Sequence, residues 1–263
     1  MKRMIFSFAS SIAFVLSQMA FSQNLVIDGD FENYSNIPNN SGGVNSTFYL
    51  HNAFEHWHKI NIYSGYYYNK VNACSQITIN STSCGVPYNS NGFQYAKSGF
   101  GYASLFYTKT KESTGEFRSS AIGGELREPL VKNKKYCSGY YLNLQNRSKY
   151  ICNGYGMAFV KEIVDSGITN YPFSYVDMSY LNYQVKSPVD LIIDDTLNWV
   201  QVADTFSTHE GNEKYFVISN YLPPGLILYE LTGFIHNGSV AFYYIDDVFV
   251  YEQKPIWVYG GDV

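Results

Sequence analysis

Two short segments of the chain gather tyrosine and amide side chains in a pattern that could bind a sugar. Flat aromatic rings stack on the CH-rich faces of sugar rings, and Asn, Gln or carboxylate groups fix the orientation through hydrogen bonds. Tyrosine also forms strands well and can cover a sheet while its hydroxyl stays in water, so a structural role is the alternative. The segments 62–69 and 88–95 hold the residues expected to contact a ligand: Tyr66, Tyr67, Tyr68, Tyr88, Asn89, Gln94 and Tyr95.

Acidic residues stand inside two apolar segments, one near each end of the chain. In 24–32, the two-residue period of a strand places Asp30 and Glu32 on one face and Phe31 on the other. In 240–251, Asp246 and Asp247 interrupt a strand pattern. Burying adjacent aspartates costs several kcal/mol unless a partner compensates their charge. We therefore expect a cation or a set of backbone donors at Asp246 and Asp247.

Other pairs of carboxylates could serve glycoside hydrolysis, which needs two such groups roughly 5 to 9 Å apart across a cleft. Asp194 with Asp195 and Glu125 with Glu128 are the available pairs, but neither lies in a recognisable motif. Asp194 and Asp195 are better explained as a turn before the strand that holds Trp199. The sequence contains no Gly-x-Ser-x-Gly, Walker or dinucleotide motif. A binding protein is therefore expected rather than an enzyme.

Three histidines, His51, His56 and His58, lie close to Trp57 in the sequence. On a strand, His56 and His58 share a face, and this spacing could bind a transition metal if a third ligand came from elsewhere. The sequence does not identify that third ligand. We expect Trp57 to face the core and both histidines to be hydrated.

The four cysteines suggest disulfides, because an even number is typical of exported proteins in an oxidising compartment. A hairpin that turns near 144–147 would set Cys137 and Cys152 opposite each other, so we predict that these two residues are paired. Cys74 and Cys84 would then close a short loop. A zinc site is the alternative, but CxxC pairs are absent and the spacings are irregular.

The first residues have the pattern of an export signal. Lys2 and Arg3 precede an apolar stretch at 5–16, and the small residues Ala20 and Ser22 fit a signal peptidase site. We predict cleavage after Ser22, which gives a signal peptide of residues 1–22 and an extracellular, cell-surface or periplasmic protein. A membrane anchor is the alternative, but it would need nearer 20 strongly apolar residues. No later segment is apolar enough to span a bilayer.

Composition and charge exclude two classes of protein. Aromatic residues make up 18% of the chain and charged residues 15%, which excludes an intrinsically disordered protein. The net charge is −4 and becomes −6 if Lys2 and Arg3 leave with the signal peptide. Because this mildly acidic chain has no basic run or stripe, nucleic-acid binding has no electrostatic basis.

The elements that must position these residues are strands. Runs of β-branched and aromatic residues alternate with Gly, Asn, Ser and Pro clusters, whereas helical periodicity is nearly absent. Since no repeat or linker divides the chain, we predict one all-β sandwich domain over 23–263, with a loop at 34–46 and a long irregular insertion at 163–190. The expected strands are 24–32, 56–63, 101–108, 136–144, 154–162, 198–206, 214–220, 228–235 and 240–251.

Two motifs near the ends of this pattern resemble those of the galactose-binding-like jelly rolls, the fold of several carbohydrate-binding modules. The first is NLVIDGDFE at 24–32, and the second is YYIDDVFV at 243–250. Segments between them, such as 86–89, 92–96 and 211–215, are similar to exported proteins of Bacteroidetes. The resemblance covers most of 24–251 and implies a jelly-roll β-sandwich, although its short motifs specify a fold better than a function.

The same resemblance implies a structural calcium ion. In that family the first and last strands lie near each other, and calcium often binds beside their junction through acidic side chains and carbonyls. Ca²⁺ prefers six to eight hard oxygen ligands. The residues of this chain that match are Asp30, Glu32, Asp246 and Asp247.

The sequence thus predicts a secreted, non-catalytic binding protein that resembles carbohydrate-binding modules and recognises cell-envelope or environmental glycans. The alternative is a surface protein that uses the same fold to contact another envelope protein, as in adhesion. A hydrolase is the minor alternative. Glycan binding predicts a row of coplanar exposed rings, whereas partner binding predicts a flatter apolar patch.

Overall fold

The computed structural model describes residues 23–35, 50–60, 65–70, 85–89, 91–109, 117–163, 178–208, 210–233 and 240–253. The predicted signal peptide, Cys74 and Cys84 lie outside these ranges, as do most of the predicted loop at 34–46 and residues 164–177 of the predicted insertion. Within the ranges, no helix has the length and hydropathy needed to cross a membrane.

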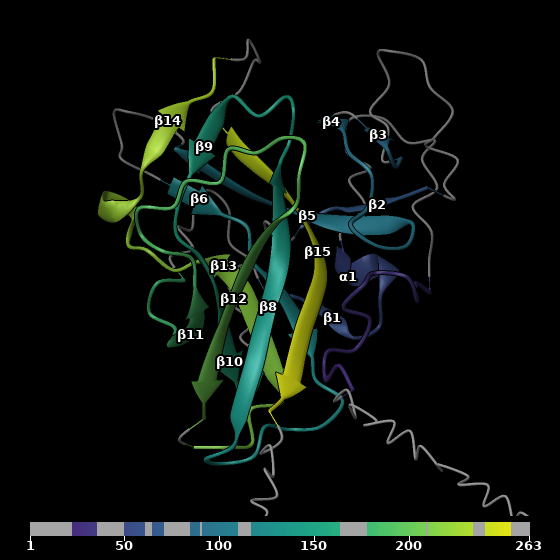
Figure 1. Cartoon of the computed structure of the whole chain (residues 1–263), viewed down its shortest axis with the longest axis vertical. Helices are drawn as coiled ribbons and strands as arrows, with labels where there is room; N and C mark the ends of the chain where they lie inside the picture. Colours follow the sequence, from purple (N-terminus) through teal and green to yellow (C-terminus); the bar gives the residue numbers. More distant parts are fainter. Residues whose placement is uncertain are drawn as a thin grey trace, which may run out of the picture.

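Antiparallel strands form two large sheets (Figure 1). The six-stranded sheet contains β12 (Val200–Ser207), β8 (Lys135–Leu144), β15 (Val240–Glu252), β5 (Gly101–Lys109) and β2 (Tyr67–Asn69) in that order, with β6 (Phe117–Ser119) paired to β5. The five-stranded sheet contains β1 (Trp57–Lys59), β7 (Ile122–Glu125), β13 (Tyr215–Asn220), β10 (Tyr155–Val160) and β11 (Tyr183–Lys186). Four short strands form two ribbons: β3 (Tyr88–Asn89) with β4 (Gly92–Phe93), and β9 (Tyr150–Cys152) with β14 (Tyr229–Leu231). A single-turn helix α1 (Leu50–Ala53) precedes β1, and a 3-10 turn η2 (Pro224–Leu226) precedes β14.

The order of the strands is that of a jelly roll. From β5 onward the chain passes back and forth between the two sheets, so that β5, β8, β12 and β15 lie in one sheet and β7, β10, β11 and β13 lie in the other. The last strand, β15, is inserted between β5 and β8, and β13 is inserted between β7 and β10. This interleaving of two Greek keys defines a jelly-roll β-sandwich, so the predicted fold class is confirmed.

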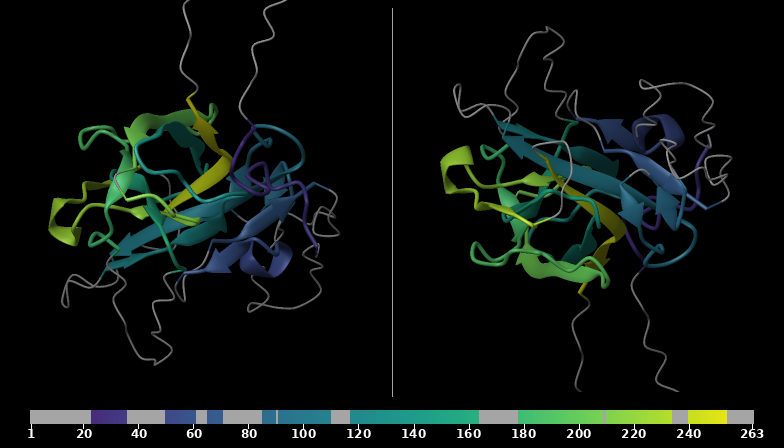
Figure 2. Two further views of the ribbon diagram at one scale, coloured as in Figure 1. Left: turned by 90° about the horizontal axis from the view of Figure 1, so that it is seen from below. Right: turned by 90° about the horizontal axis from the view of Figure 1, so that it is seen from above.

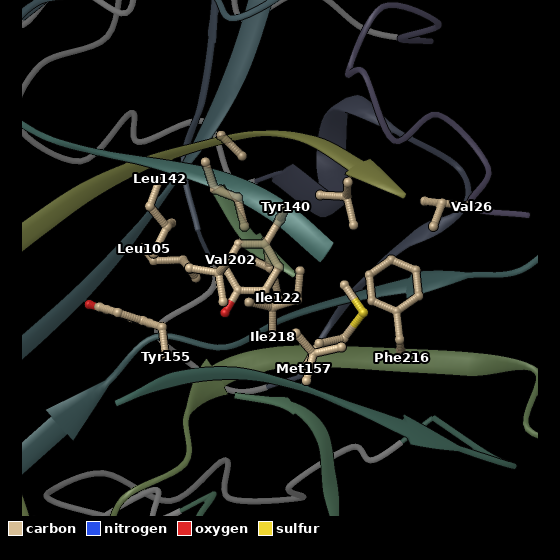
Figure 3. Packing of buried hydrophobic residues seen from close by; sticks show 14 of the residues in the cluster. Val26, Leu105, Ile122, Tyr140, Leu142, Tyr155, Met157, Val202, Phe216 and Ile218 are labelled. Carbon is tan, nitrogen blue, oxygen red and sulfur yellow. The ribbon is translucent and has the colours of Figure 1, made fainter. Parts of the chain in front are cut away.

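The two sheets pack face to face as layers and enclose the core (Figures 2 and 3). Trp57 on β1 is buried as predicted, and its ring lies 5.4 Å from the ring of Phe216 in an edge-on arrangement. Gly124 leaves room for this packing, because a Cβ atom there would lie 2.3 Å from the Phe216 ring. Other core residues of the two sheets are Leu105, Ile122, Tyr140, Leu142, Tyr155, Met157, Val202 and Ile218.

Most predicted strands lie where the sequence indicated. The predictions at 101–108, 136–144, 154–162, 198–206, 214–220 and 240–251 correspond to β5, β8, β10, β12, β13 and β15. Those at 56–63 and 228–235 correspond to the shorter strands β1 and β14. The sequence pattern missed β7, whose two glycines weaken a strand signal, and it gave β11 only as part of an irregular insertion.

The predicted strand at 24–32 is wrong. Only Val26 makes a β-bridge, to Leu126, and the chain then turns through 27–31 with positive φ angles at Asp28 and Phe31. Phe31 is fully buried beside Trp57, with 4.8 Å between the ring centroids. The turn therefore places an aromatic anchor in the core, and the two-residue alternation expected for Asp30, Phe31 and Glu32 does not apply.

The predicted disulfide between Cys137 and Cys152 is also wrong. Both residues are free thiols. The expected hairpin does not form, because β9 pairs with β14, where Cys152 lies opposite Tyr229. Cys137 lies on β8 between Thr205 of β12 and Tyr251 of β15.

Candidate functional site

The outer face of the six-stranded sheet, turned away from the core, has a covered half and an open half. On β8, the residues of the inner face are Ser138, Tyr140 and Leu142, and the strand's alternation places Tyr141 and Asn143 outside. Asn143 is buried although it faces outward, whereas Tyr141 is partly exposed. Asn143 donates to the carbonyl groups of Asp195 and Asn198 at 3.2 and 3.0 Å, so the loop before β12 covers it. Beside this loop, the segment 85–100, which includes the β3–β4 hairpin, covers the outer side of β2, β5 and β15.

Aromatic side chains of the covered half pack beneath this segment. Tyr68, Tyr102 and Tyr244 come from β2, β5 and β15, and the Tyr102 and Tyr244 rings lie 4.6 Å apart. Asn89 connects them to the hairpin, because its amide donates to the Tyr102 hydroxyl at 3.0 Å and its Oδ1 accepts from the Tyr244 hydroxyl at 2.7 Å. Asn91 donates to the Tyr68 hydroxyl at 2.8 Å. Each of these three tyrosines is thus a buried support for the hairpin.

Two of the predicted carboxylates, Asp246 and Glu32, accept hydrogen bonds from the C-terminal end of the same segment. Asp246 is fully buried, and its Oδ2 accepts hydrogen bonds from the backbone N–H groups of Lys97 and Ser98, while its Oδ1 accepts from that of Asp247. Burial and the neighbouring Asp247 raise the pKa of Asp246 to about 8, against the lowering effect of these donors. The backbone donors expected from the sequence are therefore present at Asp246.

Glu32 binds the backbone at the last residue of the segment and at the first residue of β5. Its Oε1 accepts from the N–H groups of Phe100 at 2.6 Å and Gly101 at 2.9 Å. Burial raises the pKa of Glu32, in opposition to these two bonds. Gly99 has a positive φ of 62°, and a Cβ atom there would lie 2.3 Å from a Glu32 oxygen, so this approach requires glycine.

Beyond Lys97, the open half of the outer face contains a groove of about 660 Å³. Its floor is made by β12, β8 and β15, which run side by side in Figure 1. The turn at 27–31 and Ser98 form part of its wall. The side chains that give the groove its chemistry are Asp30, Arg127, Tyr141, Gln201, Asp247 and Tyr251.

Aromatic rings and hydrogen-bonding groups meet in this groove. Phe249 and Tyr251 stack at 5.4 Å with an interplanar angle of 26°, and Tyr251 is 39% exposed. The Lys97 ammonium lies 4.5 Å from the centre of the Tyr141 ring and 3.9 Å from an Asp247 oxygen. The arrangement can stack on a flat CH-rich surface and hydrogen-bond to several hydroxyls at once.

A β-bulge in β15 creates the aromatic part of the groove. The pairing with β8 shifts between Asp246 and Phe249, and Asp247 has a positive φ of 49°. Val248 and Val250 consequently face the core, and Phe249 and Tyr251 face outward. Sequence reasoning missed Tyr141, Phe249 and Tyr251. Alternation along β8 could have revealed Tyr141, but the bulge hides the other two.

The predicted ligand-binding tyrosines separate into buried and exposed groups. Tyr67 and Tyr68 are buried, and the Tyr67 hydroxyl donates to the Phe31 carbonyl at 2.9 Å. Neither ring can therefore present a face to a ligand. Tyr66 is half-buried. Tyr88 and Tyr95 are 53% and 64% exposed, respectively.

Both predicted amide residues are buried and help to hold the hairpin. Asn89 bonds the tyrosines beneath it, as described above, and Gln94 donates to the Leu197 carbonyl at 3.3 Å. Their amide groups are therefore committed to the protein itself. The structure thus brings Tyr88 and Tyr95 to the surface and the other members of the predicted set mostly into supporting positions.

The residues proposed for calcium lie near one end of the groove. Asp30 is exposed, Asp247 is half-buried, and the Asp247 Oδ1 accepts from the Ser98 hydroxyl at 2.5 Å. Across the described residues, no three or more His, Cys, Asp or Glu side chains are grouped so that they could hold a metal ion. Calcium binding by Asp30, Glu32, Asp246 and Asp247 stays a prediction.

Of the two histidines, His56 has a structural partner. His56 Nδ1 lies 2.9 Å from Glu125 Oε2, and Lys214 approaches the other oxygen of Glu125 at 3.1 Å. Burial raises the pKa of Glu125, but the hydrogen bonds from His56 and Lys214 outweigh it and lower the pKa overall. His58 is half-buried, and its Nε2 is buried without a hydrogen-bond partner among the described residues. The prediction that both histidines are hydrated is therefore wrong for this nitrogen of His58.

In each carboxylate pair considered for hydrolysis, one residue has a structural role and the other is exposed to solvent. Glu125 is held in the ion-pair cluster, and Glu128 is exposed. Asp195 accepts from the N–H groups of Leu197 and Asn198, both at 2.8 Å, and so forms the turn expected before β12. Its neighbour Asp194 is exposed.

Comparisons with known proteins give only distant similarities. No family model and no curated protein matches the chain. Among solved structures, the xylan-binding CBM22-1 domain of Xyn10C from Paenibacillus barcinonensis is 13% identical with a TM-score of 0.33, over 62% of this chain and 78% of that domain. The CBM61 structure with β-1,4-galactotriose is 11% identical with a TM-score of 0.34, over 88% of this chain and all 100% of the other. A CBM4 structure is 11% identical with a TM-score of 0.32, over 87% and 99%. The fold assignment rests on the strand order of this chain itself.

Proposed function

We propose that this protein is an exported, non-catalytic binding protein that holds a carbohydrate in the groove on the outer face of the six-stranded sheet. The observation that carries the proposal is the combination of Tyr141 and the Phe249–Tyr251 stack with the polar residues Gln201 and Asp247 in one groove. Aromatic rings would take the apolar faces of the sugar, and the polar groups would bind its hydroxyls.

The charges of the groove favour a neutral carbohydrate. Asp28, Asp30 and Asp247 line it, whereas the cations nearby are Arg127 and Lys97. Lys97 lies between Asp247 and the Tyr141 ring, and the Arg127 Nε donates to the Asn24 carbonyl, so both cations already have partners. Because the groove presents more negative than positive charge, it would repel an acidic polysaccharide and bind it weakly.

The experiment is binding of the purified protein to a broad glycan array and to insoluble polysaccharides. We expect retention on neutral glycans that falls about tenfold or more in Tyr141→Ala and Tyr251→Ala, a loss of roughly 1.4 kcal/mol of binding free energy. Tyr180→Ala is the matched control, since Tyr180 is exposed but lies on the segment that leads to β11, away from the groove.

Two results would contradict the proposal. If the protein melts cooperatively but binds no glycan, the alternative is favoured, in which the fold contacts an envelope protein. Binding that survives both groove substitutions would show that the carbohydrate binds elsewhere on the surface.

A further inference from the structure

The β3–β4 hairpin carries a cluster of exposed aromatic rings outside the groove. Tyr88, Phe93 and Tyr95 are 53%, 37% and 64% exposed. The Phe93 ring lies 4.6 Å from that of Tyr88 and 5.3 Å from that of Tyr95, both nearly edge-on. Exposed aromatic side chains that gather in this way mark interaction sites more often than single exposed residues do. We call these three residues the hairpin patch.

Hydrogen bonds fix the hairpin patch to the body of the protein. The Phe93 N–H donates to Asn146 Oδ1 at 2.7 Å, and the Trp199 indole N–H donates to the Tyr95 carbonyl at 3.1 Å. Beneath the patch, Asn89 and Gln94 are buried and bonded, as described above. Because the support is rigid, binding to these rings would order few additional groups.

The hairpin patch is continuous with the groove. Only two residues separate Tyr95 from Ser98, which lines the groove, so the two are at most about 11 Å apart along the chain. Lys97, between them, covers the Tyr141 ring of the groove at 4.5 Å. A long ligand that leaves the groove past Lys97 would therefore meet Tyr95 first and Phe93 next.

We propose that the hairpin patch is an outer binding area for the same carbohydrate chain, so that the protein selects long chains over short ones. The inference rests on the proposed function and adds chain length as a determinant of specificity. The patch shares exposed aromatic rings with the groove, and the amide side chains of Asn91 and Asn146 hold it in place through the buried Tyr68 hydroxyl and the Phe93 N–H. A second contact on one flexible ligand strengthens binding because its association is intramolecular.

The test measures affinity for a series of chain lengths of a neutral glycan that the wild-type protein retains, from the disaccharide to the octasaccharide. In the wild type we expect affinity to rise at least tenfold between the shortest bound oligosaccharide and the octasaccharide. Phe93→Ala with Tyr95→Ala should remove most of that rise and leave the affinity for the shortest bound oligosaccharide unchanged. Tyr95→Phe, which retains the ring, should behave as wild type, and Tyr180→Ala is the surface control.

The outcomes separate the two proposals. If the wild type binds short and long chains equally, or if the double variant keeps the preference for long chains, the outer binding area is refuted while the groove stands. If groove substitutions abolish binding of every length and hairpin substitutions instead remove a protein partner from an envelope pull-down, the patch serves a protein contact. If the folded wild type binds no glycan, the proposed function fails and this inference fails with it.

Discussion

The backbone N–H of Lys97 donates to Oδ2 of Asp246 at 2.8 Å and so joins the segment above the outer face of the sheet to its central strand. Asp246 lies opposite Tyr141 in the β15–β8 pairing. The bond therefore stands at the boundary between the covered half of that face and the groove. A single buried carboxyl therefore positions Ser98 in the wall of the groove and the backbone that follows Tyr95 of the hairpin patch.

We expect the free energy of unfolding to fall as the pH rises from about 4 to 8, and Asp246→Asn to flatten this dependence. The folded protein holds a proton on Asp246 up to its raised pKa of about 8, whereas the unfolded chain releases it near the ordinary value of 3.8. The contribution of Asp246 to stability is thus complete below 3.8 and lost as the pH approaches 8. Urea unfolding at several pH values, with chelator present, measures the slope. Asp194→Asn, at an exposed position, should retain it.

If calcium binds beside the groove, chelation should lower the melting temperature by several degrees. A ligand at a hundred times its Kd stabilises the folded state by ≈ 2.7 kcal/mol, and in a protein of this size 1 kcal/mol shifts the melting temperature by roughly 2–4 °C. Asp247→Asn should abolish the response to chelator, because asparagine tolerates the positive φ at this position but lacks the charge. A melting curve that is the same with EDTA and with added Ca²⁺ would remove the predicted site.

The two described thiols should differ in reactivity. Cys152 is buried, and burial raises the pKa of its thiol to about 12, despite hydrogen bonds with the neighbouring Tyr155 and Tyr243 that lower it. Cys137 is partly exposed at the groove. Native alkylation followed by peptide mass mapping should label Cys137 and leave Cys152 unmodified until the protein unfolds. Recovery of a peptide in which these two residues are linked would contradict the structure.

Two buried tyrosines should respond oppositely to loss of the hydroxyl. Among the described residues, the Tyr140 hydroxyl has no hydrogen-bond partner, although the side chain is fully buried in the core (Figure 3). Tyr140→Phe should therefore be neutral or stabilise by about 1 kcal/mol. Tyr67→Phe should destabilise by about 1–2 kcal/mol, because its hydroxyl donates to the Phe31 carbonyl and accepts from Asn69. Denaturant midpoints of the two variants give the comparison, and equal losses of stability would contradict it.

The amino-acid sequence by itself determined most of the long strands and the fold class. Alternating apolar and aromatic runs are stable only as half-buried strands, and a strand such as β8 shows this pattern without help from its neighbours. The need to compensate Asp246 was also readable from the sequence, because a carboxyl inside an apolar strand must find hydrogen-bond donors.

The tertiary structure decided which of these residues form the groove. Uninterrupted alternation from Tyr243 would turn Phe249 and Tyr251 toward the core, but the bulge at Asp246 and Asp247 turns them outward. Tyr68 resembles an exposed tyrosine in the sequence, yet the hairpin that covers it comes from residues 85–100. Bulges and cover by distant segments depend on contacts between parts of the chain far apart in the sequence. Local periodicity carries no signal of them, so only the folded chain shows where its surface is open.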